Sequence, residues 1–186
     1  MKAGLVWPPM LRRPCETARM DDLAGRLRET GSQLLALREP LVAGEPWPLS
    51  AAYGTEPEAD WGPREVLAHV NEMLPYWATQ IRVILAGDPA EATPFGRIST
   101  DPDRIGRIAT DRELRVGDLL DRIAVGLAIV EDVLTGLSPA DLERRGVHST
   151  RGEMTVGDSV DRFLVSHVAE HVEQLQTILA RRGATA

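Results

Sequence analysis

The sequence predicts an all-α fold, a four-helix bundle with long crossover loops and one short extra helix. Apolar residues recur at the three- and four-residue spacing of an amphipathic helix in four long segments. These segments begin and end at capping residues, prolines and glycines. Neither an internal repeat nor the alternation of apolar and polar residues that is typical of strands is found. The 186 residues are expected to form one domain.

The first two long helices are expected over residues 16–39 and 63–86. Leucines at a three- or four-residue spacing define the apolar side of the first, and Pro40 ends it. At the start of the second, Gly62 can serve as N-cap and Pro63 occupies the first turn, where proline is favoured. Gly87 follows its last residue.

The third long helix is expected to open at a capping box formed by Thr110 and Glu113 and to close at Gly136. The short extra helix begins at Ser138 by the same logic, with Asp141 as the returning carboxylate. Both helix starts are predicted from the hydrogen bonds that a capping box makes.

Thr155 and Asp158 cap the last long helix, which is expected to end near Gly183. Two connections are long for a bundle, residues 41–60 and 88–109, and connections of that length often carry function. Arginines of the second connection could meet an anionic ligand or be paired within the fold. We therefore divide the chain into an N-terminal arm (1–16), the bundle (17–182) and a C-terminal tail (183–186).

The composition excludes several classes of function. A formal net charge of −7 and an isoelectric point near 5.1 argue against nucleic acid and an anionic membrane as partners. No apolar run approaches the roughly eighteen residues that span a bilayer. A cytoplasmic protein is the expectation. Cys15 is the single cysteine, so neither an internal disulfide nor a cysteine-based zinc site can form.

Three of the four histidines are expected to point into the bundle. At about 100° per residue, His167 and His171 lie on the apolar side of the last helix, and His69 lies on that of the second. Buried imidazoles need hydrogen bonds, charges or a metal ion. Spacing alone leaves open whether these three bind a metal ion or are satisfied within the core. His148 is expected in a turn between helices and not as a ligand.

Two known metal motifs do not fit the sequence. HVAEH matches the inverted zinc-protease pattern H-x-x-E-H, but that site needs an acidic ligand far downstream, and only fifteen residues follow His171. A di-iron site of the ferritin type needs Glu three residues before His on two helices, and no histidine here has it. Neither reading is supported.

Two segments resemble the DinB-like superfamily, which includes bacterial thiol S-transferases and mycothiol-dependent maleylpyruvate isomerases. In WGPREVLAHVNEMLPYW, a tryptophan and a proline open a helix, and a histidine follows six residues after the proline. The second segment, about a hundred residues later, is FLVSHVAEHVEQLQTIL, with two histidines four residues apart. The resemblance extends from about Thr17 to Arg182.

The resemblance implies a dimeric four-helix bundle that binds one divalent metal ion through His69, His167 and His171. Zinc is the first expectation for the metal, and nickel or iron also suit imidazole ligands. Gly62 stands where a serine is common in the superfamily. The isomerase branch often has glutamate where His167 stands, and its members tend to carry a second domain, for which this chain has no room. Isomerase activity is therefore not expected to carry over.

Two classes of function follow as hypotheses. The first is a metal-dependent thiol S-transferase, in which a metal-bound thiolate of mycothiol, bacillithiol or glutathione attacks a small electrophile. Met73 and Tyr76 could line its pocket, and Glu72 or Glu170 could take the thiol proton; core packing or solvated charge is the alternative for each. The second is a non-catalytic, dimeric metal-binding bundle that acts in binding or stress response.

Overall fold

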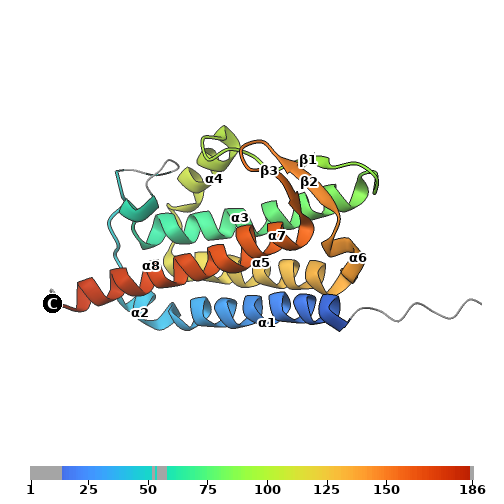
Figure 1. The fold of residues 1–186 in the computed structure, drawn as a ribbon. Helices are drawn as coiled ribbons and strands as arrows, with labels where there is room; N and C mark the ends of the chain where they lie inside the picture. Colours follow the sequence, from blue (N-terminus) through green and yellow to red (C-terminus); the bar gives the residue numbers. More distant parts are fainter. Residues whose placement is uncertain (1–13, 52, 54–57, 185–186) are drawn as a thin grey trace, which may run out of the picture.

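The computed structural model describes residues 14–51, 53 and 58–184 and shows a bundle of four long helices. In it, α1 packs against α5 and α8, and α3 packs against α5 and α8, so the four helices enclose one core (Figure 1). The long helices are α1 (Pro14–Ala36), α3 (Pro63–Ala86), α5 (Val116–Gly136) and α8 (Ser166–Gly183). The all-α prediction is confirmed, although a small sheet accompanies the helices.

The remaining elements are short; α7 and η2 lead directly into α8, and the others lie in the connections. The helical ones are α2 (Arg38–Ala43), the 3₁₀ turn η1 (Glu58–Asp60), α4 (Pro102–Asp111), α6 (Pro139–Leu142), α7 (Val156–Val160) and the π-helical segment η2 (Asp161–Val165). The strands β1 (Thr93–Phe95), β2 (Arg145–His148) and β3 (Gly152–Thr155) form a sheet in that order, parallel between β1 and β2 and antiparallel between β2 and β3. The sheet and α4 lie on the same side of the bundle, next to α3 (Figure 1).

Three of the helix starts that were predicted from capping residues lie where the sequence predicts them. α3 begins at Pro63 after Gly62 and ends at Ala86. Ser138 and Asp141 form a capping box at α6. Thr155 and Asp158 form another at α7, from which the chain continues helically to Gly183.

The predicted start of the third long helix is wrong. Thr110 lies in the last turn of α4, and its hydroxyl donates to the carbonyl oxygen of Gly106 rather than capping a new helix. The long helix begins at Val116 instead. α4 has its own cap: the Asp101 carboxylate accepts from the backbone N–H of Arg104, and Pro102 occupies the first turn.

Three further expectations differ from the structure. The first long helix ends at Ala36, and α2 follows it, so helical structure continues to Ala43. Residues 88–109 are not an irregular loop, because they form β1 and most of α4. The three strands were not predicted, since each has only three or four residues, too few for a strand-like alternation. Residues 1–13 of the expected arm lie outside the described residues.

The connection between α2 and α3 is fastened to the bundle by buried polar side chains. The fully buried carboxylate of Glu65 accepts from the backbone N–H of Ser50 and lies 3.2 Å from the Arg112 guanidinium. Arg112 also donates to the carbonyl oxygen of Ser50 and lies over the Tyr53 ring. These contacts tie the connection to α3 close to η1, whose first residue is Glu58.

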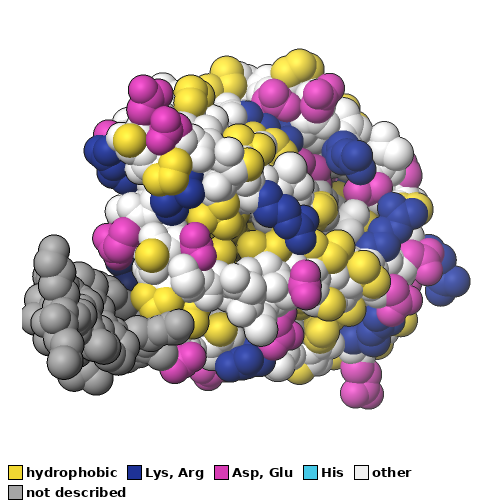
Figure 2. Space-filling view, turned by 90° about the vertical axis from the view of Figure 1, so that its right-hand side faces the viewer, with side chains coloured by type: hydrophobic (Ala, Val, Ile, Leu, Met, Phe, Trp, Pro, Cys, Tyr) yellow, Lys and Arg dark blue, Asp and Glu magenta, His cyan; other side chains and the backbone are white. Residues whose placement is uncertain are grey.

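The core is aliphatic and runs the length of the bundle. Its largest fully buried side chains are Leu34, Leu41, Leu67, Met73, Leu74, Ile84, Ile108, Leu119, Leu120, Ile123, Leu142 and Leu164. On the face shown in Figure 2, charged side chains of both signs lie scattered around apolar ones, so the net charge of −7 does not form a uniform acidic surface there. Within the described residues, no helix is long and apolar enough to cross a membrane.

Candidate metal centre

His69 lies on the inner side of α3, 4% exposed, six residues after the proline that opens the helix. The Trp61 ring meets the His69 ring edge-on at 5.5 Å between centroids, and the Arg104 guanidinium lies 5.7 Å from the Trp61 ring. Trp61 is itself buried. The tryptophan and proline that open α3 therefore have a structural role: the proline starts the helix and the tryptophan supports the imidazole.

His167 and His171 come from α8, one turn apart, and face His69. The three ring centroids lie 4.6 to 5.2 Å from one another. His69 Nε2 lies 3.0 Å from His167 Nε2. His171 Nδ1 is 3.0 Å from the Gln174 Oε1 oxygen, which can only accept a hydrogen bond, so Nδ1 carries the proton and Nε2 is left with its lone pair.

The polar atoms of this cluster fit a metal ion better than they fit a closed core. His171 Nε2 and His69 Nδ1 are buried without a hydrogen-bond partner. An unsatisfied buried polar atom costs about 1–3 kcal/mol. A nitrogen lone pair aimed into a cluster of other imidazoles is the arrangement that a cation can satisfy.

Glu58 is a fourth member that sequence reasoning missed. One ligand atom from each of Glu58, His69, His167 and His171 lies within 4.8 Å of all the others, and the set is a group that could hold a metal ion. Glu58 is also paired with Arg104, whose NH2 group lies 2.6 Å from Oε1. No local sequence signal identifies Glu58. It lies in the 3₁₀ turn η1 before α3, and it reaches the histidines only because the connection folds back.

The pKa values of the three imidazoles favour the neutral form. Burial lowers the pKa of His167 and that of His171 to about 4, and repulsion from His167 adds to the effect on His171. Burial is the main reason that the pKa of His69 lies well below its usual value, and repulsion from His171 and His167 lowers it further. All three are therefore neutral near pH 7, the state in which imidazole binds metals.

A pocket of about 440 Å³ opens beside the cluster, and His69, His167 and Glu58 form part of its wall. His148, expected in a turn, is a correction: it ends β2, is 4% exposed and lines this pocket without belonging to the metal-binding group. Its Nδ1 accepts from the backbone N–H of Thr150. Burial lowers the pKa of His148.

Two stacked aromatic rings lie beside His148. The Trp77 and Phe163 rings are stacked at 3.9 Å with an interplanar angle of 6°, and His148 stacks on Phe163 at 5.3 Å. Phe163 lies in η2, where the backbone N–H of Ser166 bonds to the carbonyl oxygen of Asp161, five residues back. Such π-helical turns are frequent at functional sites. Here the wide turn directly precedes His167.

The four other candidate residues divide between two pockets and the core. Met73 is 1% exposed and belongs to the core. Glu170 lines the pocket beside the cluster, with an oxygen 3.9 Å from His167 Nδ1. Glu72 and Tyr76 instead line a separate pocket of about 500 Å³.

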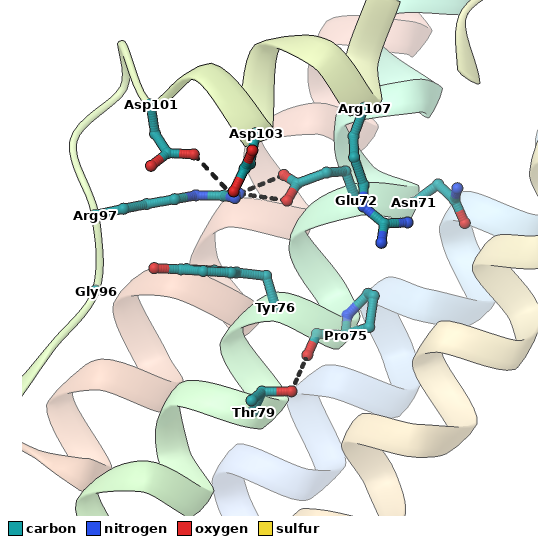
Figure 3. A pocket seen from close by; sticks show the side chains of 10 residues that line it. All are labelled: Asn71, Glu72, Pro75, Tyr76, Thr79, Gly96, Arg97, Asp101, Asp103 and Arg107. Carbon is teal, nitrogen blue, oxygen red and sulfur yellow. Dashed lines mark hydrogen bonds and ion pairs between the residues drawn. The ribbon is translucent and has the colours of Figure 1, made fainter. Parts of the chain in front are cut away.

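Arg97 forms the partition between these two pockets, since it lines both. Figure 3 shows its side chain extended above the Tyr76 ring, with the guanidinium reaching both oxygens of Glu72 at 2.5 Å and Asp101 at 3.9 Å. Burial raises the pKa of Glu72, and the hydrogen bond from Arg97 opposes that effect. Of the two candidate proton acceptors, only Glu170 faces the histidine cluster.

Comparison with protein families gives one result that agrees with this geometry. A family model described as the DinB superfamily matches residues 7–175, most of the chain. The match includes the helix opened by Trp61 and Pro63 and the part of α8 that carries His167 and His171. Comparisons with curated proteins and with solved structures found no match. The fold, the histidine cluster and the family match together show that this chain belongs to the DinB superfamily.

Proposed function

We propose that the protein is a metal-dependent thiol S-transferase, which joins a low-molecular-weight thiol to an electrophilic small molecule. One observation carries the proposal. Three imidazoles that are neutral near pH 7 converge, and two of them, His69 and His167, line a pocket of about 440 Å³, so a cation held by the three would be reachable from the pocket. A purely structural cluster needs no such opening.

In this proposal His69, His167 and His171 hold the ion, and Glu58 lies beside them. Zinc is the first choice, with nickel and iron as the others that suit imidazole. A divalent cation supplies a charge that favours thiolate over thiol near pH 7. Gln174 holds His171 in the tautomer that the ion requires, because it occupies the Nδ1 proton and leaves Nε2 for the ion.

The reaction itself is a nucleophilic displacement or addition. The sulfur of the thiol forms a bond to an electrophilic carbon, and a halide or the oxygen of an opened epoxide takes the electron pair. The thiol proton passes to Glu170, a half-exposed carboxylate at the pocket wall that can release it to water. Mycothiol is the first thiol to test, with bacillithiol and glutathione as the others.

The test is a conjugation assay with full-length protein loaded with zinc, nickel or iron. We expect the protein loaded with at least one of these metals to accelerate the joining of one of the three thiols to a chloronitroarene or an epoxide. A chelator should remove the acceleration. Glu170→Gln should lower the rate while metal content stays unchanged. Metal-loaded protein that is inactive with all three thiols would contradict the proposal.

A second candidate is a non-catalytic, dimeric metal-binding bundle, and Glu58 is the observation that favours it. Four protein ligands around one ion make the closed arrangement of a structural site, whereas three leave a position for substrate. Arg104 competes for the same carboxylate at 2.6 Å, which favours the open arrangement. The homodimer is a proposal for either candidate: Val83, Val125 and Ile129 leave apolar surface exposed on α3 and α5, and sedimentation velocity would measure the mass.

A further inference from the structure

We propose that the pocket beside the histidine cluster binds an aromatic carboxylic acid, with its carboxylate on Arg151 and its ring against Trp77, His148 and Phe163. The inference rests on the proposed function in one respect, since an acid of this kind that also carries a carbon–halogen bond or an epoxide would be the electrophilic substrate of the transferase. It deepens that function by assigning the substrate a charge and a shape. Three independent features of the pocket support it.

The first feature is the sign of its charge. Four arginines and two glutamates line the pocket, although the whole chain carries a formal charge of −7. A pocket that is positive within an acidic protein favours an anionic ligand over a neutral one.

The second feature is the state of each arginine. Arg104 is held by Glu58 at 2.6 Å and Arg97 by Glu72 at 2.5 Å, so both are used within the fold. Arg162 lies 3.9 Å from the Glu170 carboxylate. Arg151 differs, because in the described part of the chain no carboxylate lies within ion-pair distance of its guanidinium. Arg151 is exposed and lies on the turn between β2 and β3. Its planar guanidinium matches a carboxylate through two parallel hydrogen bonds.

The third feature is the position of this arginine relative to the aromatic wall. The Arg151 guanidinium carbon lies 5.8 Å from the Phe163 ring centroid, and the Phe163 ring is stacked with Trp77 on one contact and with His148 on the other. Aromatic rings prefer stacked or edge-on neighbours, which adds to the burial of their surface. A carboxylate on Arg151 therefore places an attached ring next to the wall. An aliphatic acid of equal size would gain less.

The experiment is calorimetric titration of full-length protein with 2-naphthoate, in chelator-treated and in zinc-loaded form and without any thiol. We expect binding in both forms. Arg151→Ala should weaken it about tenfold, because a charge-assisted hydrogen-bonded pair is lost. Arg145→Ala is the matched control: Arg145 lies on the same hairpin, pairs with Glu153 and is outside the pocket lining, so it should leave the affinity unchanged.

Two ligand analogues test the remaining parts of the proposal. 2-Naphthamide, which lacks the charge, should bind about tenfold more weakly, and decahydro-2-naphthoate, which lacks the flat ring, should bind several-fold more weakly. Equal binding of the amide, or an unchanged affinity in Arg151→Ala, would overturn the anion assignment. Equal binding of the saturated acid would overturn the aromatic one.

Loss of binding on chelation would place the carboxylate on the ion and overturn its assignment to Arg151. Because no thiol and no turnover enter this measurement, its result is separate from that of the conjugation assay. A failed conjugation with intact naphthoate binding would count against the transferase alone. A successful conjugation with no naphthoate binding would count against this inference alone.

Discussion

Gln174 connects the histidine cluster to the connection that carries Glu58. Its side-chain oxygen accepts from His171 Nδ1 at 3.0 Å, and its nitrogen donates to the carbonyl oxygen of Glu58 at 2.7 Å. One amide therefore sets the orientation of an imidazole on α8 and the position of a carboxylate on η1. Such groups behind a metal ligand are positioning residues, and they act on affinity without touching the ion.

Replacing Gln174 by leucine should therefore weaken zinc binding about tenfold, the lower end of the range for groups that orient a ligand. Competition with a chromophoric chelator would measure the dissociation constant. Gln176→Leu is the matched control, because Gln176 is an exposed glutamine on the same helix. Equal zinc affinities for the two variants would show that the Gln174 amide has no role in the site.

Gly96 is the residue that lets His148 pack into the pocket wall. Its φ is +80°, and a Cβ added there would lie 2.4 Å from His148 Cδ2. Gly96→Ala should lower the free energy of unfolding by at least about 1 kcal/mol, since both the backbone and the contact are unfavourable. Urea unfolding would measure it. Gly106→Ala, with open space around it inside α4, should leave stability unchanged or raise it. Similar losses in both variants would contradict this account.

At the scale of elements, the helix that presents His167 and His171 depends on how it begins. The Thr155 hydroxyl accepts from the Asp158 backbone N–H at 3.0 Å, and the Asp158 carboxylate accepts in return from the Thr155 N–H. Thr155→Ala should lower the free energy of unfolding by about 1 kcal/mol. Thr177→Ala, an exposed threonine within the same continuous helix, is the control for urea unfolding. A smaller loss in Thr155→Ala than in the control would refute the cap.

Capping chemistry explains which elements could be predicted from the sequence. The starts of α3, α6 and α7 are set by Gly62–Pro63, Ser138 and Thr155, so local reading places them within a residue. The start of α4 carries the same kind of signal in Asp101 and Pro102, but the prediction left this stretch within the connection 88–109. Because α4 was not recognised, the start of α5 was predicted at Thr110, within α4, instead of at Val116.

The parts that could not be predicted depend on contacts between distant residues. The three inward histidines follow from helical periodicity. Glu58 reaches them only because the connection folds back and Gln174 binds its carbonyl oxygen. The π-helical turn η2 has no sequence signal, and in the structure it accompanies the stacking of Phe163 on Trp77, a residue of α3. Arg151 lines the pocket because β2 pairs with β3, and these strands are too short to be recognised in the sequence.

Considered as a whole molecule, the protein keeps the uncharged imidazoles of His69 and His171 buried and that of His167 partly buried between its helices, and this makes stability depend on pH. The pKa of His167 and that of His171 are lowered to about 4 in the folded state, against 6.5 for the ordinary group. Between these values the unfolded chain binds more protons than the folded one. The stability that the neutral imidazoles provide is therefore complete above about pH 6.5 and is lost as the pH falls towards 4.

For metal-free protein we expect the free energy of unfolding to fall on acidification across that window, by at most about 1.4 kcal/mol per pH unit for each histidine. Urea unfolding at several pH values between 4 and 7 measures the slope. His167→Gln removes one of the titrating groups and should make the slope shallower. A flat profile, or an unchanged slope in the variant, would contradict burial of neutral imidazoles.

The candidate centre also links elements that are far apart in the chain, because His69 lies on α3 and both His167 and His171 lie on α8. An ion that binds only the folded protein adds about 2.7 kcal/mol at a concentration one hundred times its dissociation constant, which raises the melting temperature of a chain of this size by about 5–10 °C. Thermal melts with and without zinc should show this rise in the unchanged protein and in His148→Ala. It should be absent from His69→Ala, His167→Ala and His171→Ala, since each variant loses one of the three imidazole ligands. If all four variants keep the rise, zinc binds elsewhere and the three histidines only pack within the bundle.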